Sequence, residues 1–272
     1  MAVPDLSAWP CEDIWQAIEP GLPGFTVEVL REIDSTNAEL MRRARAGQTE
    51  PVLLVAEHQH AGRGRLGRQW IDQRVATGRT GSLMFSLGLA LAPADWSGLS
   101  LAVGLSLAHS LHADIRLKWP NDLWWRDRKL AGVLVETLNW GGHPGGPQRY
   151  VVIGVGINIV CPSADGLHTA PAGLTDLLPD ITASQALHYV AAPLVAAVQQ
   201  FERRGFAPLQ RAFNARDALA QVSVTLSDGT QGMARGVDTD GALLVATSSG
   251  LHRITSAEVS VRALHPPMAP HA

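Results

Sequence analysis

The chain has 272 residues, of which 46% are hydrophobic and 17% are charged, so it can fold around a sizeable core as one large domain with a smaller second one. This composition excludes a disordered or fibrous protein. The formal net charge of −3 argues against a general nucleic-acid-binding surface.

The cysteines and the chain ends indicate the compartment. Two cysteines, Cys11 and Cys161, lie far apart, and the N-terminus has no basic segment followed by an apolar one. No apolar run approaches the roughly 20 residues that cross a bilayer. We therefore expect a cytoplasmic protein with reduced thiols and no membrane association.

The first elements are a short helix over residues 12–18 and an alternating strand over residues 26–33. The polar residues Asp34, Ser35, Thr36 and Asn37 then precede the start of a second helix. Two interpretations stand side by side. A helix cap needs only one of these residues, and the others offer small donors and acceptors to a polar ligand.

A glycine- and arginine-rich loop follows a buried strand over residues 52–57. Gly62, Gly64 and Gly67 match G-x-G-x-x-G, but the dinucleotide-binding fingerprint also needs a following helix and an acidic residue about 20 positions later. Neither is present after Gly67, and no Gly-Lys-Ser/Thr closes a Walker loop. We interpret the segment as a loop whose arginines meet a small anion; the alternative is a solvated basic surface loop.

The sequence from about residue 72 to residue 137 predicts several strands of a sheet and one buried helix. We expect a flexible polar stretch over about 72–80, a strand over 82–91, a helix over 97–112, strands over 115–119 and 123–126, a turn at 127–128, and a strand over 129–137.

Lys118, Asp122 and Lys129 lie close together along these last strands. A surface set of ion pairs is one interpretation. The other is a site at the margin of the core, because Lys118 precedes Trp-Pro and Lys129 opens an almost wholly apolar run.

The apolar run 150–160 fits a central strand that is buried on both faces. Gly154 and Gly156 leave room for a flat group or for close backbone approach. Asn158 needs a polar partner if it is buried, and either a neighbouring loop or a ligand could supply it.

The C-terminal part divides into helical scaffold and a small all-β module. A capping box at Thr182 and Gln185 opens a helix that ends near Gly205, and a shorter helix covers about 208–218. From Gln221 to Leu264, turn signals at intervals of about 8 to 12 residues predict short strands that close into a barrel or pack on the main domain.

Together the loop arginines, two lysines, one acidic residue and a glycine-bearing strand predict a site where negative charges meet. When a carboxylate attacks the α-phosphate of a nucleotide, two anions must approach, and catalysis is largely neutralisation and positioning. Magnesium usually takes one or two carboxylates plus phosphate oxygens, and Asp122 is the best available ligand.

Five segments in this order resemble the motif series of biotin protein ligases, and the resemblance covers about residues 26 to 264. They are Asp34-Ser35-Thr36-Asn37; Gln59 with Gly62-Arg63-Gly64-Arg65-Leu66-Gly67-Arg68-Gln69-Trp70; Lys118-Trp119-Pro120-Asn121-Asp122; Lys129-Leu130-Ala131-Gly132-Val133-Leu134-Val135-Glu136; and Gly154-Val155-Gly156-Ile157-Asn158.

The resemblance implies an α+β fold: a mixed β-sheet flanked by helices, as in class II aminoacyl-tRNA synthetases, followed by a small SH3-like β-barrel. The expected division is a catalytic domain over residues 1–219 and the barrel with its tail over 220–272.

The resemblance also implies a two-step reaction. Biotin and Mg-ATP give biotinyl-5′-AMP and pyrophosphate, and biotin then passes to one lysine of a biotin carboxyl carrier protein, as in acetyl-CoA carboxylase. The expected small-molecule partners are thus biotin, ATP and Mg²⁺. We expect no DNA binding, and a monomer or weak homodimer.

The family pattern assigns roles residue by residue. Ser35, Thr36, Asn37 and Gln59 would line the biotin pocket, and Arg63, Gly64 and Arg65 belong to a loop that orders over biotin and the adenylate. Lys129 would contact the biotin carboxylate and the α-phosphate, and Asp122 would aid the metal or charge balance. The expected catalytic residues are Lys129, Arg65, Asp122 and Lys118, and Arg68, Trp70, Gly132 and Asn158 complete the expected substrate-binding set.

Three features depart from the family pattern. Leu66 stands where an arginine is common, and the segment after Trp70 is longer and more polar than the usual Ser-Pro-Gly connection. The roughly 25 residues before the first strand cannot hold the winged helix-turn-helix of family members that act as repressors.

Three rival functions fit the sequence less well. A lipoate ligase shares the wider fold, but the Gly-Arg-Gly-Arg loop disfavours it. A biotin or nucleotide sensor without turnover would be expected to lack Lys129 or Arg65, and both are present. A nucleic-acid-binding protein is disfavoured by the acidic charge balance.

Overall fold

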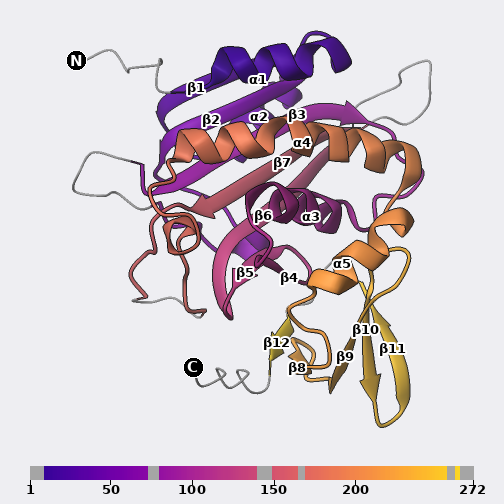
Figure 1. The fold of residues 1–272 in the computed structure, drawn as a ribbon. Coiled ribbons are helices and arrows are strands. Elements are labelled where there is room, and N and C mark those ends of the chain that lie inside the picture. Colours follow the sequence, from indigo (N-terminus) through magenta and orange to yellow (C-terminus); the bar gives the residue numbers. More distant parts are fainter. Residues whose placement is uncertain (1–8, 73–79, 140–148, 165–168, 256–260, 264–272) are drawn as a thin grey trace.

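The computed structural model describes residues 9–72, 80–139, 149–164, 169–255 and 261–263. A seven-stranded mixed sheet in the order β1-β2-β3-β7-β6-β5-β4 forms its larger part (Figure 1). The strands are β1 (Thr26–Ile33), β2 (Val52–Gln59), β3 (Ser82–Leu91), β4 (Arg116–Lys118), β5 (Asp122–Trp125), β6 (Arg128–Asn139) and β7 (Arg149–Asn158). β1 and β2 pair in parallel, and the other neighbours pair antiparallel.

Helices flank this sheet, which confirms the expected mixed sheet with flanking helices. The helices are α1 (Cys11–Ile18), α2 (Thr36–Arg45), α3 (Leu99–Leu111), α4 (Ala183–Arg204) and α5 (Gln210–Arg216), with short 3₁₀ turns η2 (Glu19–Gly21), η3 (Arg65–Gly67), η4 (Leu174–Asp176) and η5 (Ala207–Leu209). Figure 1 shows α3 and α4 lying across one face of the sheet. Within the described ranges, every helix is too short or too polar to span a bilayer.

The two faces of the sheet build two separate cores, because successive strand residues point to opposite sides. On β2, Leu53 and Val55 join the large core with α1, α3 and α4. Val52 and Leu54 join a small core under α2. Polar side chains, among them those of Gln59 and Lys129, gather on the part of this second face that α2 leaves uncovered.

The predicted all-β module is a five-stranded antiparallel sheet in the order β11-β10-β9-β8-β12. Its strands are β8 (Ser223–Leu226), β9 (Gln231–Val237), β10 (Leu243–Thr247), β11 (Gly250–Ile254) and β12 (Val261–Ala263). Among the described residues β11 and β12 do not pair, so the sheet is open there, and closure into an SH3-like barrel stays a prediction.

One buried hydrogen bond joins the module to the larger sheet. Trp119, 1% exposed, donates from its indole Nε1 to the carbonyl oxygen of Gly241 at 3.0 Å. Trp119 stands three residues before Asp122 in the chain, so the docking contact and a predicted site residue belong to one short segment.

The turn between β5 and β6 differs from the prediction. It was expected at residues 127–128, but Trp125 pairs with Arg128, which leaves Arg126 and Asp127 as the two turn residues. Both have positive φ, 45° and 61°, as a tight two-residue hairpin requires. Most of the stretch expected to be flexible, residues 73–79, lies outside the described residues.

Candidate active site

The polar segment before α2 serves both as a helix cap and as a cavity wall. Ser35 is the N-cap, and its hydroxyl accepts a hydrogen bond from the Ala38 amide at 3.4 Å. Thr36 and Asn37 are equally buried but extend toward β3, where the Ser86 hydroxyl lies 2.7 Å from Thr36 Oγ1 and donates to Asn37 Oδ1 at 2.6 Å. The two interpretations of this segment are therefore compatible.

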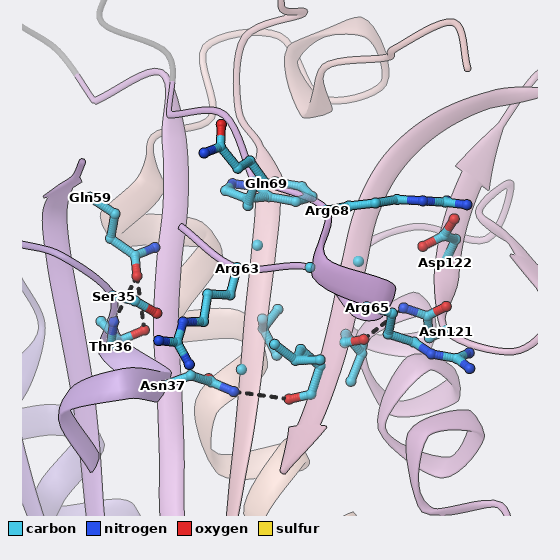
Figure 2. Close-up of a pocket in the computed structure, with 18 of the residues that line it drawn as sticks. Ser35, Thr36, Asn37, Gln59, Arg63, Arg65, Arg68, Gln69, Asn121 and Asp122 are labelled. Atoms are coloured by element: carbon cyan, nitrogen blue, oxygen red, sulfur yellow. Dashed lines mark hydrogen bonds between the residues drawn. The ribbon is translucent and has the colours of Figure 1, made fainter. Parts of the chain in front are cut away.

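Gln59 ends β2 beside this cluster. Its Oε1 accepts from the Thr36 backbone amide at 2.7 Å, as Figure 2 shows. Asn37 donates from Nδ2 to Glu136 Oε2 at 2.8 Å, so the side chains of Gln59, Ser86 and Glu136 tie three strands to one helix start. The result is a fixed array of donors and acceptors at the N-terminal end of α2.

The two glycines of β7 make room for side chains from elsewhere. A Cβ on Gly154 would lie 2.0 Å from Asn37 Oδ1, and a Cβ on Gly156 would lie 2.5 Å from the Trp70 ring. Both glycines point to the face of the sheet that α2 leaves open, whereas Val155 points into the large core. Gly156 thus admits a flat group, which is the indole ring of the protein's own Trp70, and Gly154 admits the side-chain amide of Asn37.

The cationic loop between β2 and β3 folds back on itself. The Gly64 amide donates to the Arg68 carbonyl at 2.7 Å, and the Trp70 amide donates to the Gly62 carbonyl at 2.9 Å. Gly67 has a positive φ of 71°. Gly62 is needed for another reason, because a Cβ there would lie 2.6 Å from the Trp70 carbonyl oxygen.

The loop arginines line the cavity, and Figure 2 shows Arg63, Arg65 and Arg68 around it. Burial lowers the pKa of Arg65, partly opposed by the negative charge of Asp122. Leu66 is 56% exposed and does not line the cavity, whose cationic side chains are those of Arg63, Arg65, Arg68 and Lys129.

A β-bulge turns Lys129 toward Asp122. Leu123 pairs with Ala131 but Trp124 pairs with Lys129, so Leu130 has no partner on β5. The extra residue shifts the alternation and brings Lys129 to the open face, where its Nζ lies 2.8 Å from Asp122 Oδ1.

This ion pair borders the cavity, and the opposite residue is small. Gly132 pairs with Asp122, and a Cβ there would lie 3.5 Å from both Asp122 Oδ1 and Lys129 Nζ, in ordinary contact. The side chains of Lys129 and Asp122 are 31% and 18% exposed, so a ligand in the cavity can reach both.

Two predicted residues lie away from the cavity wall. Lys118 places its Nζ 4.7 Å from the centre of the Trp124 ring. Asn158 is buried and donates to the carbonyl oxygens of Ala172 at 3.0 Å and Lys129 at 3.3 Å. The neighbouring-loop interpretation of Asn158 thus describes its contacts, and through them it supports the backbone of Lys129.

Asp122 and eleven of the twelve predicted substrate-binding residues meet around one cavity of about 130 Å³. The eleven are Ser35, Thr36, Asn37, Gln59, Arg63, Gly64, Arg65, Arg68, Trp70, Lys129 and Gly132.

Sequence reasoning missed several residues of the same cavity. Gln69, Asn121 and Leu134 line it, and Ser86 supports it from β3. The signal for Ser86 was a polar residue in the middle of the apolar run of β3, which predicts a buried partner. Among the described residues, no group of three or more His, Cys, Asp or Glu side chains is placed to hold a metal.

The sequence matches the biotin/lipoate A/B protein ligase family over residues 29–158 and the biotin protein ligase C terminal domain over residues 221–262. The bifunctional ligase/repressor BirA of Escherichia coli (strain K12) is 34% identical over 252 residues, covering 89% of this chain and 75% of that protein. The biotin--[acetyl-CoA-carboxylase] ligase of Paracoccus denitrificans is 33% identical over 243 residues, covering 85% and 98%. This chain belongs to the biotin protein ligase family.

A solved structure agrees with this assignment. The biotin protein ligase from Aquifex aeolicus in complex with biotin and ATP is similar with a TM-score of 0.71 and 25% identity, covering 87% of this chain and 98% of that one. The family expected from the five sequence motifs is thereby confirmed.

Proposed function

We propose that this chain is an ATP-dependent biotin protein ligase that forms biotinyl-5′-AMP and transfers biotin to a lysine of a biotin carboxyl carrier protein. The observation that carries the proposal is that Lys129, Asp122 and Arg65 border the same cavity as the polar cluster at the start of α2. The named relatives support the substrate class, since one is a biotin--[acetyl-CoA-carboxylase] ligase.

The first step joins two anions. The biotin carboxylate oxygen attacks the α-phosphorus, a phosphorus–oxygen bond forms, and pyrophosphate leaves with the electrons of the bond that breaks. Lys129 and the loop arginines offset the negative charge that both reactants carry, and a partly buried site makes this stabilisation stronger than it is in water. Asp122 holds the ammonium of Lys129 in place at 2.8 Å.

The second step consumes the mixed anhydride. A neutral lysine amine of the carrier attacks the acyl carbon, an amide bond forms, and AMP leaves while the amine loses a proton. The protein's part here is to keep water away from the anhydride until the carrier arrives, and we assign that role to the loop of Arg63, Arg65 and Arg68.

The polar cluster suits the ureido end of biotin, which offers one carbonyl acceptor and two N–H donors. Ser35, Thr36 and Asn37 present hydroxyl and amide groups that can match both kinds. Their positions are set by bonds to Gln59 and Ser86, so little ordering is needed on binding.

Magnesium fits the cavity as an ion that arrives with the triphosphate. It takes one or two carboxylates together with phosphate oxygens, and Asp122 is the one carboxylate that lines the cavity within the described part of the chain. When bound, the ion would neutralise phosphate charge and aid the departure of pyrophosphate.

Other expectations from the sequence stay proposals. We propose a catalytic domain over residues 1–219 and a C-terminal module over 220–272, a division that falls between α5 and β8. An SH3-like closure of the module, a cytoplasmic location, a monomer or weak homodimer and the lack of DNA binding also belong here.

ATP–pyrophosphate exchange tests the proposal. With Mg²⁺, we expect exchange with biotin and none with lipoate or without an acid. Lys129→Ala should lower the exchange rate by at least about 100-fold, the loss typical of removing one group that stabilises transition-state charge.

Two further variants provide a control and a test of Lys118. Arg31→Ala, on the exposed edge of β1, should exchange like the parent. Lys118→Ala decides whether Lys118 acts in catalysis, because its side chain does not line the cavity. Exchange with lipoate, or undiminished exchange by Lys129→Ala, would contradict the proposal.

A further inference from the structure

His58 and Asp72 connect the two ends of the cationic loop. His58 is the penultimate residue of β2, and Asp72 follows Trp70 by two positions. Their side chains meet with His58 Nδ1 3.0 Å from Asp72 Oδ2, across 14 positions of sequence that contain the whole loop. The pair therefore closes the base of the loop.

Three backbone hydrogen bonds join residues of the loop to one another. The bonds that join Gly64 to Arg68 and Trp70 to Gly62 make up one bridge between Arg63 and Gln69, and the Arg68 amide donates to the Arg65 carbonyl at 3.2 Å. Such a short excursion has little buried apolar surface of its own to hold it against opening. A side-chain tie at its base then has a large share in fixing its position.

The pair is also partly shielded from water. The Asp72 side chain is 7% exposed and that of His58 is 31% exposed. Asp72 Oδ1 is buried without a hydrogen-bond partner in the part of the chain that the structure describes. A buried carboxylate with one oxygen unsatisfied depends on its remaining partner, so the bond to His58 is costly to lose.

Both residues stand next to parts of the cavity. Gln59, directly after His58, accepts from the Thr36 amide. Trp70 packs on Gly156 and has its ring centre 6.0 Å from Lys129 Nζ. Movement at the base of the loop would therefore shift Trp70 against the ion pair and move the arginines relative to the polar cluster.

We propose that His58 and Asp72 are positioning residues that clasp the cationic loop over the cavity. They touch no reacting atom in this assignment and act through Trp70 and the loop arginines. Their effect on activity rests on the ligase function proposed above, whereas their effect on loop position does not.

Trypsin tests the clasp without any ligand, because it cuts after Arg63, Arg65 and Arg68. In His58→Leu we expect cleavage at these three sites, mapped by mass spectrometry, to be about fivefold faster than in the parent, from the loss of one partly exposed charge-assisted hydrogen bond. His58→Asn keeps a donor near the place of Nδ1 and should restore most of the protection. His60→Leu, at an exposed neighbour, is the matched control and should cleave like the parent.

Steady-state exchange kinetics test the consequence for the site. If the loop is in place less often, a smaller fraction of the protein molecules is ready to bind ATP. KM for ATP should therefore rise in His58→Leu while kcat stays within about twofold of the parent. A purely structural role would lower the unfolding midpoint in urea and leave both the cleavage rate and KM unchanged, and that result would overturn the proposal.

The two proposals fail differently. If the parent shows no biotin-dependent exchange, the ligase function is wrong, and the tryptic rates still decide whether the clasp exists. If the parent exchanges but His58→Leu is cleaved no faster than the parent, the clasp is wrong and the ligase function stands.

Discussion

Single glycines of β7 determine which side chains reach the cavity. Gly154 faces the amide of Asn37, which in turn bonds Ser86 and Glu136. A methyl group at Gly154 would overlap Asn37 Oδ1 at 2.0 Å, and Asn37 cannot retreat without breaking those bonds. The polar cluster around Asn37 can therefore form only if position 154 has no side chain.

Gly154→Ala should consequently destabilise the protein by about 2 kcal/mol and lower biotin-dependent exchange, because overpacking a fixed polar cluster forces side-chain and backbone shifts. Urea unfolding and the exchange assay measure the two effects. Gly21→Ala is the matched control, since a Cβ there meets nothing within 4 Å, and it should change stability by less than about 0.5 kcal/mol. An unchanged Gly154→Ala variant would mean that Asn37 moves freely.

The β5–β6 hairpin closes with a turn in which two residues other than glycine have positive φ. Its turn uses Arg126 and Asp127 with positive φ, although glycine or asparagine is favoured at such positions. Arg126 lies with its guanidinium carbon 4.6 Å from the centre of the Trp125 ring, and this cation–π contact favours arginine at the position.

Asp127→Gly should stabilise the protein by about 0.5 kcal/mol, because glycine adopts the left-handed region without strain. Thermal unfolding measures the difference. Asp114→Gly provides the comparison, since Asp114 is exposed and has no positive φ, and there glycine should destabilise. Equal effects at both positions would show that the turn is not strained.

Much of the fold and site could be predicted because the signals are local. The bounds of β1 and β3 follow from alternation and apolar runs, and the Thr182 cap of α4 follows from a short motif. The cavity residues could be named because they match positions in the family motifs. Their spacing in the sequence did not by itself reveal which of them are in contact.

What escaped prediction depends on pairing between distant segments. The bulge that turns Lys129 to the open face is set by register with β5, which the apolar run itself does not encode. The bonds of Asn158 go to Lys129 and Ala172, which come from two other segments. The clasp of His58 with Asp72 likewise needs the return path of the loop.

At the scale of the whole molecule, Asp217 lies between α5 and β8, where the chain passes from the large sheet to the module. The Leu219 amide donates to its Oδ1 at 2.8 Å, and its buried Oδ2 has no partner among the described residues. Burial raises the pKa of Asp217 to about 6, from an ordinary value of 3.8.

The sign of the effect on stability follows from proton binding. Between these two pKa values the folded state holds a proton on Asp217 that the unfolded chain has lost, so the free energy of unfolding falls as pH rises through about 4 to 6. The stabilising contribution is present in full below the unfolded value and is gone above the folded one.

Asp217→Asn should remove this pH dependence while the amide oxygen still accepts from Leu219. Between about pH 4.5 and about pH 7.5, the stability of the variant relative to the parent should rise by about 2 kcal/mol, because each unit of pKa difference corresponds to about 1.4 kcal/mol. Urea unfolding of both proteins at several pH values measures this difference, in which the other titrating groups cancel. A difference that stays constant with pH would contradict the prediction. It would show that the pKa of Asp217 is the same in the folded and the unfolded protein, so that burial at the junction between the two sheets does not disfavour its charged form.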